Sequence, residues 1–170
     1  MDFPRIFPAK LAYRLKDVKL KISIFQNTVS DFRTEFQAKC PFKTQVAAEG
    51  KSGPKIAFAL IDEYVQKTRA VQDSASQLND LERLFEMGIS EHPAITHCET
   101  ELVLLKRVWD AVQLVEDIFE AWDAILWCVI QPLDLLEQVK QMQILVEKLP
   151  KETKNWQVEE NFRVLRETKF

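Results

Sequence analysis

The N-terminal part of the chain carries apolar side chains at intervals of three and four residues, the repeat of one helix face. The members of this stripe are Leu11, Leu15, Val18, Ile22, Phe25, Val29, Phe32 and Phe36. Leu20, Ile22 and Ile24 alternate locally as in a strand, but the helical repeat around them is much longer. The pattern therefore predicts one helix of roughly thirty residues, which ends near Pro41 because proline cannot continue it.

The hydrophobic repeat stops between Cys40 and Pro54. This stretch contains Pro41, Gly50, Ser52, Gly53 and Pro54, which favour a loop. A second helix is predicted from about Lys55 to Met87, with Gly88 as its terminator. Its buried side is expected to carry Ile56, Leu60, Tyr64, Val71, Ala75, Leu78, Leu81 and Phe85.

The longest helical pattern lies between Pro93 and Val129. Its apolar positions form a near-heptad seam of Ile95, Cys98, Leu102, Leu105, Trp109, Val112, Val115, Phe119, Trp122 and Leu126. Ser90 is expected to accept hydrogen bonds from the first free amides of this helix, and Pro93 suits its first turn. At a rise of 1.5 Å per residue the helix would be about 55 Å long, which suits an elongated bundle.

Two further helices are predicted towards the C-terminus. The fourth follows Pro132, ends at Leu149-Pro150 and carries Leu135, Leu136, Val139, Met142, Leu145 and Val146. The fifth is expected from about Thr153, with Trp156, Phe162 and Leu165 as its apolar residues. It reaches Phe170 without a cap, from which we expect the native chain to continue.

These patterns predict an all-α fold, an elongated antiparallel helical bundle of about five helices, two or three of them long. The expected organisation has three parts: a long N-terminal helix in residues 1–39, a loop in 40–54 and a further helical region in 55–170. Only three glycines occur in the chain, and this scarcity also argues against a β-rich fold with many tight turns.

The charge balance argues against a nucleic-acid partner. The chain has 23 Lys and Arg residues against 26 Asp and Glu residues, a formal net charge of -3, with both signs interspersed. No apolar run approaches the ~20 residues that a membrane-spanning helix needs, and the N-terminus lacks the features of a secretory signal peptide. We therefore expect no membrane partner, a cytosolic location, and buried free thiols at Cys40, Cys98 and Cys128.

Two short motifs suggest chemistry, and both fail on their context. Gly50-Lys51-Ser52 matches the end of a phosphate-binding loop, but Gln45 stands where the motif needs its first glycine, and no buried strand precedes it. His92 and His97 are five residues apart and Cys98 is adjacent, so they do not present one helical face to a metal. The sequence therefore predicts no catalytic residue, no cofactor-binding residue, no metal ligand and no small-molecule substrate.

Several blocks of the chain, in order, resemble the dynein heavy chain family. Leu81-Glu82-Arg83-Leu84-Phe85-Glu86-Met87-Gly88-Ile89 is similar to the family's "AE-x-LFGLPI", although Leu81 replaces the usual Ala and Gly88 a common Pro. Glu101-Leu102-Val103-Leu104-Leu105-Lys106-Arg107-Val108-Trp109-Asp110 is similar to "KEL-x-LLKQVWD", a form typical of axonemal outer-arm heavy chains of the β type. Further matches are Phe32-Arg33-Thr34-Glu35-Phe36, Cys40-Pro41-Phe42, Ala121-Trp122-Asp123-Ala124-Ile125-Leu126-Trp127, and Leu149-Pro150-Lys151 followed by Trp156.

The resemblance covers about residues 30–170 and points to the heavy chain N-terminal region 2, where the tail meets the linker. The family's later "RHW" motif is absent from this sequence. The resemblance implies a non-catalytic segment that transmits force in an ATP-driven microtubule motor of the cytoskeleton, in a cilium or flagellum axoneme. The implied partners are the rest of the heavy chain, with its tail and its ring of ATPase modules, and dynein intermediate and light chains.

If the segment has a role of its own, we expect large aromatic side chains to carry it by stiffening the helices. These structural residues are Phe85, Trp109, Trp122, Trp127 and Trp156. The helical seam by itself is equally typical of a protein-interaction or scaffold module, such as a coiled-coil adaptor unrelated to a motor. A nucleotide-dependent enzyme built on Gly50-Lys51-Ser52 is a third reading, which predicts a nucleotide effect on thermal stability.

Overall fold

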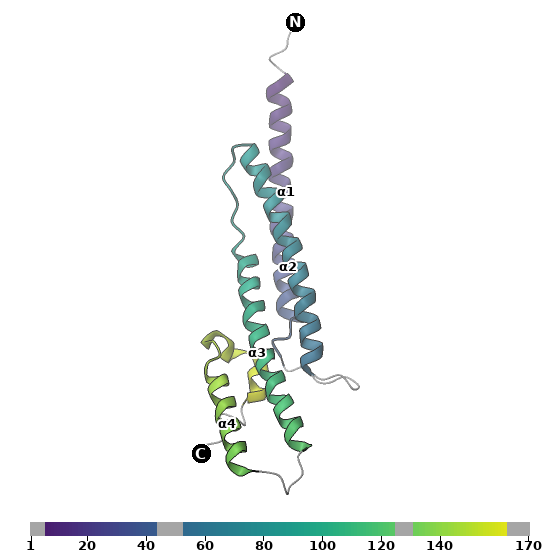
Figure 1. Cartoon of the computed structure of the whole chain (residues 1–170). Coiled ribbons are helices and arrows are strands. Elements are labelled where there is room, and N and C mark those ends of the chain that lie inside the picture. Colours follow the sequence, from purple (N-terminus) through teal and green to yellow (C-terminus); the bar gives the residue numbers. More distant parts are fainter. Residues whose placement is uncertain (1–5, 44–52, 125–130, 163–170) are drawn as a thin grey trace. The chain divides into compact units, whose positions relative to one another are not determined.

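The computed structural model describes residues 6–43, 53–124 and 131–162, with side chains omitted for 6–11 and 159–161 (Figure 1). Within these ranges it contains four α-helices, two 3-10 helices and no strand. The α-helices are α1 (Ile6–Lys39), α2 (Gly53–Leu84), α3 (Pro93–Asp123) and α4 (Pro132–Glu147). The 3-10 helices are η2 (Lys151–Asn155) and η3 (Gln157–Phe162). The predicted all-α class and helical packing are confirmed.

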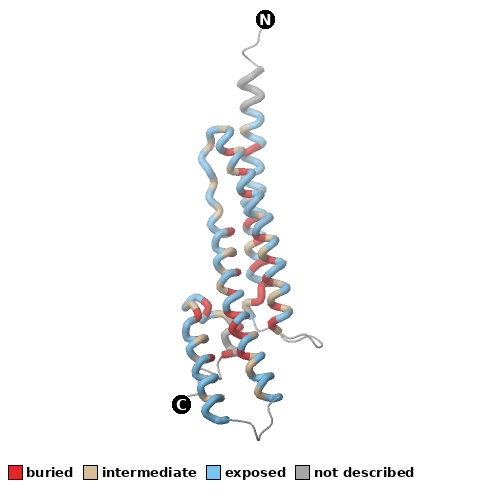
Figure 2. The backbone as a smooth tube through the Cα atoms, viewed as in Figure 1, coloured by how far each residue is buried: buried red, intermediate tan, exposed pale blue. Residues whose placement is uncertain are grey.

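Helices α1 and α3 bury much of the apolar stripes that the sequence predicts, and Figure 2 shows buried positions recurring along them. The predicted stripe of α2 is wrong at its start, where Ala57 and Ile61 are buried and the expected Ile56 and Leu60 are only half-buried. On α1, the residues Val18, Val29, Phe32 and Phe36 are buried, whereas Leu20 and Ile24 are exposed, so the helical repeat prevails over the local alternation. On α3, the seam is buried from Ile95 to Val115, but Phe119 near the helix end is 42% exposed. The predicted extension of this helix through Leu126 to Val129 falls on residues 125–130, outside the described residues.

One expected helix end and one expected helix cap are wrong. Helix α2 ends at Leu84, and Glu86, not Gly88, takes the left-handed conformation at its C-terminus, with a φ of 52°. The backbone amides of Glu86 and Met87 donate to the carbonyls of Arg83 and Glu82, which satisfies helix-end carbonyls before the chain reaches Gly88. At the start of α3, the Ser90 side chain does not cap the helix; instead the His92 carbonyl accepts from the amide of Ile95.

The predicted fifth α-helix is also wrong within the described residues. Two 3-10 helices stand in its place, separated by Trp156 in an extended conformation, with a ψ of 139°. The Thr153 amide donates to the Pro150 carbonyl and the Trp156 amide to the Thr153 carbonyl, which closes two tight turns. The amide of Val158 donates to the carbonyl of Phe42, which is distant in sequence. Because this amide is taken by a partner far along the chain, the regular α-helical ladder is interrupted.

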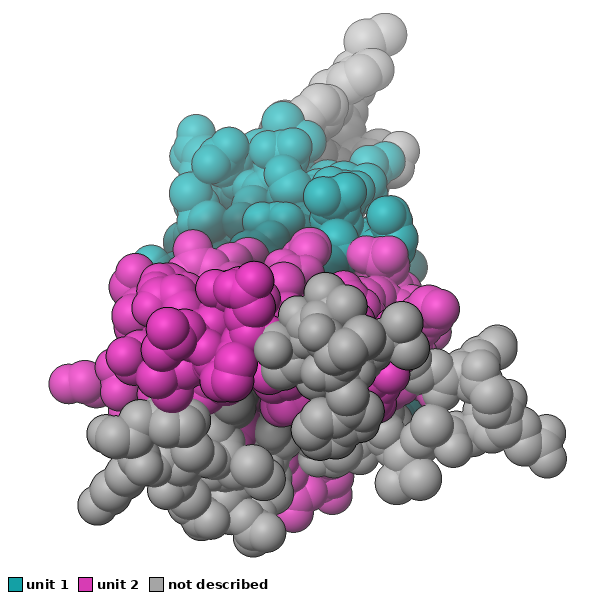
Figure 3. All heavy atoms as spheres, turned by 60° about the horizontal axis from the view of Figure 1, so that its bottom comes forward, with its two compact units in different colours: residues 1–39, 64–100 teal, residues 40–63, 101–170 magenta. Residues whose placement is uncertain are grey.

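The chain forms two compact units, coloured separately in Figure 3. Unit 1 comprises residues 1–39 and 64–100, and unit 2 comprises 40–63 and 101–170. In unit 1, α1 and the second part of α2 pack antiparallel (Figure 1), around a cluster of Val29, Ala75 and Ile95. In unit 2, the buried residues include Leu105, Val108, Trp109, Met142, Val146, Val158 and Phe162. The predicted three-part division at residues 39 and 54 stays a prediction.

Candidate functional site

An aromatic junction in unit 2 joins three stretches of chain that are distant in sequence. We define it as Pro41, Phe42, Trp109, Trp156 and Val158. The α3 seam turns Trp109 inward, where only 1% of it is exposed, and its indole Nε1–H donates to the Pro41 carbonyl over 2.9 Å. A buried indole N–H needs an acceptor, and this backbone carbonyl supplies it.

The same junction holds Phe42 from a second side. The rings of Phe42 and Trp156 meet edge to face, with centroids 5.0 Å apart and planes at 73°. The Val158 amide donates to the Phe42 carbonyl over 3.1 Å. Residues 41–42 are therefore tied both to α3 and to the segment of η2 and η3.

A second aromatic contact links α3 to α4. Trp122 Nε1–H donates to the Gln138 side-chain oxygen over 2.7 Å, and the ring of Phe119 packs edge-on against that of Trp122 at 5.1 Å. Trp122 is half-buried and Gln138 is exposed, so water competes for this hydrogen bond more than it does at Trp109.

The structure brings two of the five predicted structural residues together. Trp109 and Trp156 share the aromatic junction. Trp122 lies near the end of α3, and half-buried Phe85 lies in unit 1, in the turn after α2. Trp127 lies outside the described residues. The acceptor groups of Pro41 and Phe42 are backbone atoms, which side-chain patterns do not reveal.

In unit 1, one carboxylate joins α1 to α2. Glu35 accepts from Lys39 on its own helix at 3.1 Å, and from the Tyr64 hydroxyl and Lys67 on α2 at 3.1 and 3.2 Å. Hydrogen bonds from Lys39, Lys67 and Tyr64 lower the pKa of Glu35 from 4.5 to about 2. Beneath this group the ring of Tyr64 packs edge-on against Phe36, with centroids 5.6 Å apart.

A buried carboxylate holds the connection between α2 and α3. Glu82 is fully buried and accepts from both the backbone amide of Ser90, at 2.7 Å, and the Ser90 hydroxyl. Sequence reasoning missed this residue, although the spacing from Ala75 and Leu78 to Glu82 continues the buried face of α2. Elsewhere, on α3, partial burial and the neighbours Glu120 and Asp117 raise the pKa of Glu116.

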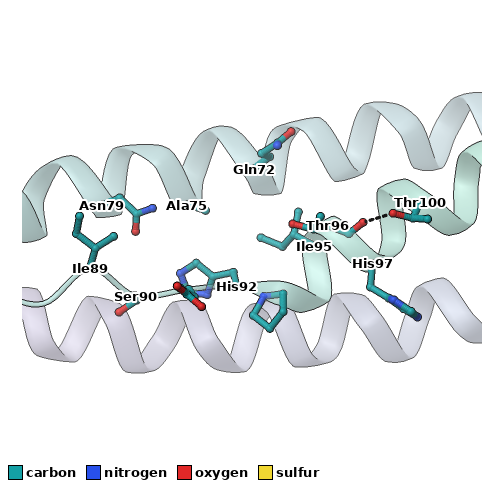
Figure 4. Close-up of a pocket in the computed structure, with 12 residues that line it drawn as sticks. Gln72, Ala75, Asn79, Ile89, Ser90, His92, Ile95, Thr96, His97 and Thr100 are labelled. Atoms are coloured by element: carbon teal, nitrogen blue, oxygen red, sulfur yellow. Dashed lines mark hydrogen bonds between the residues drawn. The ribbon is translucent and has the colours of Figure 1, made fainter.

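An open groove in unit 1 is lined by both His92 and His97, whereas Cys98 is not among its lining residues (Figure 4). It has a volume of about 610 Å³ and is lined in part by Asn79, Ser90, His92, His97 and Thr100. His92 packs its ring edge-on against Phe25, with centroids 5.0 Å apart, and its buried Nε2 lacks a hydrogen-bond partner within the described part of the chain.

The groove does not assemble a metal centre from these residues. Cys98 Sγ accepts from Arg33 Nη1 at 3.3 Å, and Figure 4 shows His92 and His97 at different places along the groove. Across residues 6–43, 53–124 and 131–162, no three His, Cys, Asp or Glu residues are grouped to hold a metal ion. Gly50-Lys51-Ser52 lies outside these ranges. None of the described helices is long and apolar enough to cross a membrane.

Dynein heavy chains are similar to this chain over most of its length, which confirms the resemblance seen in the sequence. The "Dynein beta chain, flagellar outer arm" of Chlamydomonas reinhardtii is 28% identical over 158 residues, 89% of this chain. The "Dynein alpha chain, flagellar outer arm" of the same organism is 27% identical over 143 residues, and human "Dynein axonemal heavy chain 17" is 24% identical over 139 residues, each covering 82% of this chain. No protein-family model matches the chain.

These relatives are far longer than the chain described here, which spans 3% of the length of each. The similarity therefore concerns one segment of a dynein heavy chain.

Proposed function

We propose that this chain is a non-catalytic segment of the tail and linker start of a dynein heavy chain, and that it transmits force in a ciliary or flagellar microtubule motor. The observation that carries the proposal is its similarity, over 82–89% of its length, to heavy chains named as flagellar outer arm and axonemal dyneins. In this proposal the ATPase lies elsewhere in the motor, and the partners of this segment are the remainder of the heavy chain and the intermediate and light chains.

The contacts of unit 2 support a mechanical role. A segment transmits force only if it resists bending, and resistance requires contacts between stretches of chain that bending would separate. The aromatic junction supplies such contacts through Trp109 and Trp156, and Trp122 adds one between α3 and α4. We assign the stiffening role to these tryptophans, and extend it to Phe85 and Trp127 as a prediction. The division into residues 1–39, 40–54 and 55–170 is part of the same proposal.

Association with an ATP-driven microtubule motor can be tested on the native protein. The chain is tagged at its own gene, cilia are isolated, and the extract is sedimented with microtubules in the absence and presence of ATP. We expect the tag to sediment without ATP and to be released by ATP. A tag that stays in the supernatant, or that sediments equally in both conditions, would contradict the proposal.

Force transmission requires a separate measurement on the isolated motor. Trp109→Phe removes the indole donor at the junction, so we expect slower microtubule gliding with little change in ATP hydrolysis. Leu133→Ala is the matched control, since Leu133 is 79% exposed on α4. Equal losses of gliding and hydrolysis, or no change in gliding, would remove the mechanical role while leaving the motor assignment intact.

A helical interaction module unrelated to a motor is the alternative function. The observation that favours it is the set of exposed apolar side chains on α1, which include Tyr13, Leu20 and Ile24. An interaction module predicts no ATP-sensitive sedimentation with microtubules, so the first experiment separates the two functions.

A further inference from the structure

Helix α1 carries apolar side chains on the face opposite its buried stripe. Tyr13, Leu20 and Ile24 are 75%, 59% and 56% exposed, whereas Val18 and Val29 are buried. At about 100° per residue, Leu20 lies about 200° around the helix from Val18. The exposed residues follow spacings of seven and four, so they form one narrow stripe, which we call the outer stripe of α1.

The outer stripe has the register of a coiled-coil seam. Tyr13 and Leu20 occupy d positions and Ile24 the following a position, where partner helices interdigitate. The e and g positions that flank them hold Arg14, Lys16, Lys21 and Ser23, all exposed, and the first three are basic. One carboxylate, Asp17, stands at the intervening a position and pairs with Lys21 at 2.9 Å.

The flanking charges select the partner. In a pairing of two copies of this stripe, basic e and g residues would face basic e and g residues in either orientation, and like charges there are repulsive. A helix with Glu or Asp at its e and g positions would instead form ion pairs along both flanks. The chain as a whole is acidic, at -3, so this local basic character is not a general property of its surface.

A groove beside the stripe offers space for side chains of the partner. It lies in unit 1 between α1 and α2, has a volume of about 300 Å³, and is lined in part by Lys21, Ile24, Thr28, Gln77 and Leu81. Ile24 and Leu81 give this groove apolar lining that suits a side chain from an apolar seam, and Lys21, which pairs with Asp17, also lines it. A membrane surface fits less well, because between residues 12 and 39 the remaining faces of α1 offer no broad apolar area: one face is polar and the other is packed against α2 and α3.

We propose that the outer stripe of α1 docks an amphipathic helix of another polypeptide, whose apolar seam is flanked by acidic residues. The inference does not depend on the proposed motor function, since it rests on the exposure, spacing and charges of α1 and on the groove beside it.

The experiment measures binding of synthetic helices to the full chain. The probe is a labelled peptide of about three heptads with Ile and Leu at a and d and Glu at e and g; the control peptide has Lys at e and g. By fluorescence anisotropy we expect the chain to bind the Glu peptide in preference to the Lys peptide, and the binding to weaken as salt is added. Binding of neither peptide, or equal binding of both, would overturn the proposal.

A second set of measurements uses variants of the chain, in which either the basic flanks or the apolar residues of the outer stripe are replaced. The combined variant R14E, K16E and K21E is expected to bind the Glu peptide about tenfold more weakly and to prefer the Lys peptide. The variant L20S with I24S should lose binding of the Glu peptide, while L133S, an exposed site on α4, should keep it. A charge-reversed chain that has the wild-type preference would contradict the proposal.

A second copy of this chain and a lipid surface are the two other possible occupants of the outer stripe, and each predicts a different result with the same variants. If the face pairs with a second copy, the wild-type chain sediments as a dimer and L20S with I24S as a monomer. If it binds lipid, the chain co-sediments with vesicles of phosphatidylserine and phosphatidylcholine but fails to select between the peptides. Either result would replace the acidic helix as the occupant.

Discussion

Trp109 combines a large buried ring with one polar atom that must find a partner. It is the largest of the fully buried side chains in the described part of the molecule, and its N–H reaches the Pro41 carbonyl. The heptad-like spacing of α3 predicts the burial, because Trp109 lies between Leu105 and Val112 in the seam. It does not predict the acceptor, which lies 68 residues away along the chain.

We expect Trp109→Phe to lower the free energy of unfolding by about 1–3 kcal/mol, since the buried carbonyl loses its donor and part of the ring volume is lost. Urea unfolding followed by circular dichroism measures the change. Trp122→Phe is the matched control and should cost less, because the Trp122 hydrogen bond is to an exposed side chain. Equal costs at the two positions would contradict the importance given to the Pro41 carbonyl.

Glu82 shows how a buried polar side chain is tolerated when its oxygens accept hydrogen bonds. Both hydrogen bonds come from Ser90, so the carboxylate fixes the connection between α2 and α3. We expect Glu82→Ala to destabilise the chain by about 1.5–3 kcal/mol and to speed hydrogen exchange at the Ser90 amide. Glu91→Ala, an exposed carboxylate in the same connection, should change neither quantity. An unchanged exchange rate of the Ser90 amide in Glu82→Ala would show that Glu82 does not fix the connection between α2 and α3.

At the level of the helix, the end of α2 is stabilised at a conformational cost. Glu86 takes the left-handed conformation that glycine adopts without strain. We expect Glu86→Gly to raise the free energy of unfolding by about 0.5–1 kcal/mol, because relief of the backbone strain exceeds the entropy that glycine adds to the unfolded chain. Thermal unfolding compares it with Glu86→Ala, which removes the same side chain but keeps the strain. The prediction fails if the glycine variant is no more stable than the alanine variant.

The pairing of α1 with α2 should depend on pH through Glu35. Its pKa is depressed to about 2 in the folded chain, from an ordinary 4.5. The carboxylate therefore contributes stability that is fully present above about 4.5 and is lost as the pH falls towards 2. In urea unfolding we expect Glu35→Gln to be less stable than the wild type at neutral pH, with the difference shrinking at pH near 2.

Asp73→Asn on α2 is the control for this titration, because Asp73 is exposed. The free energy of unfolding of Asp73→Asn should differ little from that of the wild type, both at neutral pH and at pH near 2. A stability gap between Glu35→Gln and the wild type that persisted unchanged at low pH would contradict the role of the Glu35 charge.

For the whole molecule, α2 and α3 each contribute residues to both compact units. Unfolding of one unit therefore frays helices that also belong to the other, and we expect a single cooperative transition. The three tryptophans of the described residues, Trp109, Trp122 and Trp156, lie in unit 2, so their fluorescence reports on that unit, while circular dichroism reports on all helices. The two urea curves should coincide; a fluorescence midpoint that differs from the dichroism midpoint would show that the units unfold independently.

The repeats of apolar residues along the sequence predicted the four α-helices and the buried stripes of α1 and α3. The same repeats gave a wrong prediction in the C-terminal part. There the apolar pattern around Trp156 and Phe162 predicts an α-helix, whereas the structure has the 3-10 helices η2 and η3. The reason is that the Val158 amide and the Trp156 ring find partners in Phe42. Periodicity carries no information about such partners, because they come from a distant stretch of chain.

By itself, the sequence determined the all-α class, the helix starts at Pro93 and Pro132, and the similarity to dynein heavy chains. These three features depend on the local spacing of residues or on the order of motifs, and the sequence contains both kinds of information. Only the tertiary structure decided how the polar groups are satisfied: Trp109 with Pro41, Glu82 with Ser90, and Glu35 with α2. A donor and its acceptor are brought together by packing, so their identity becomes visible only once the helices are assembled. The outer stripe of α1 was likewise hidden among the apolar residues of that helix until burial separated its two faces.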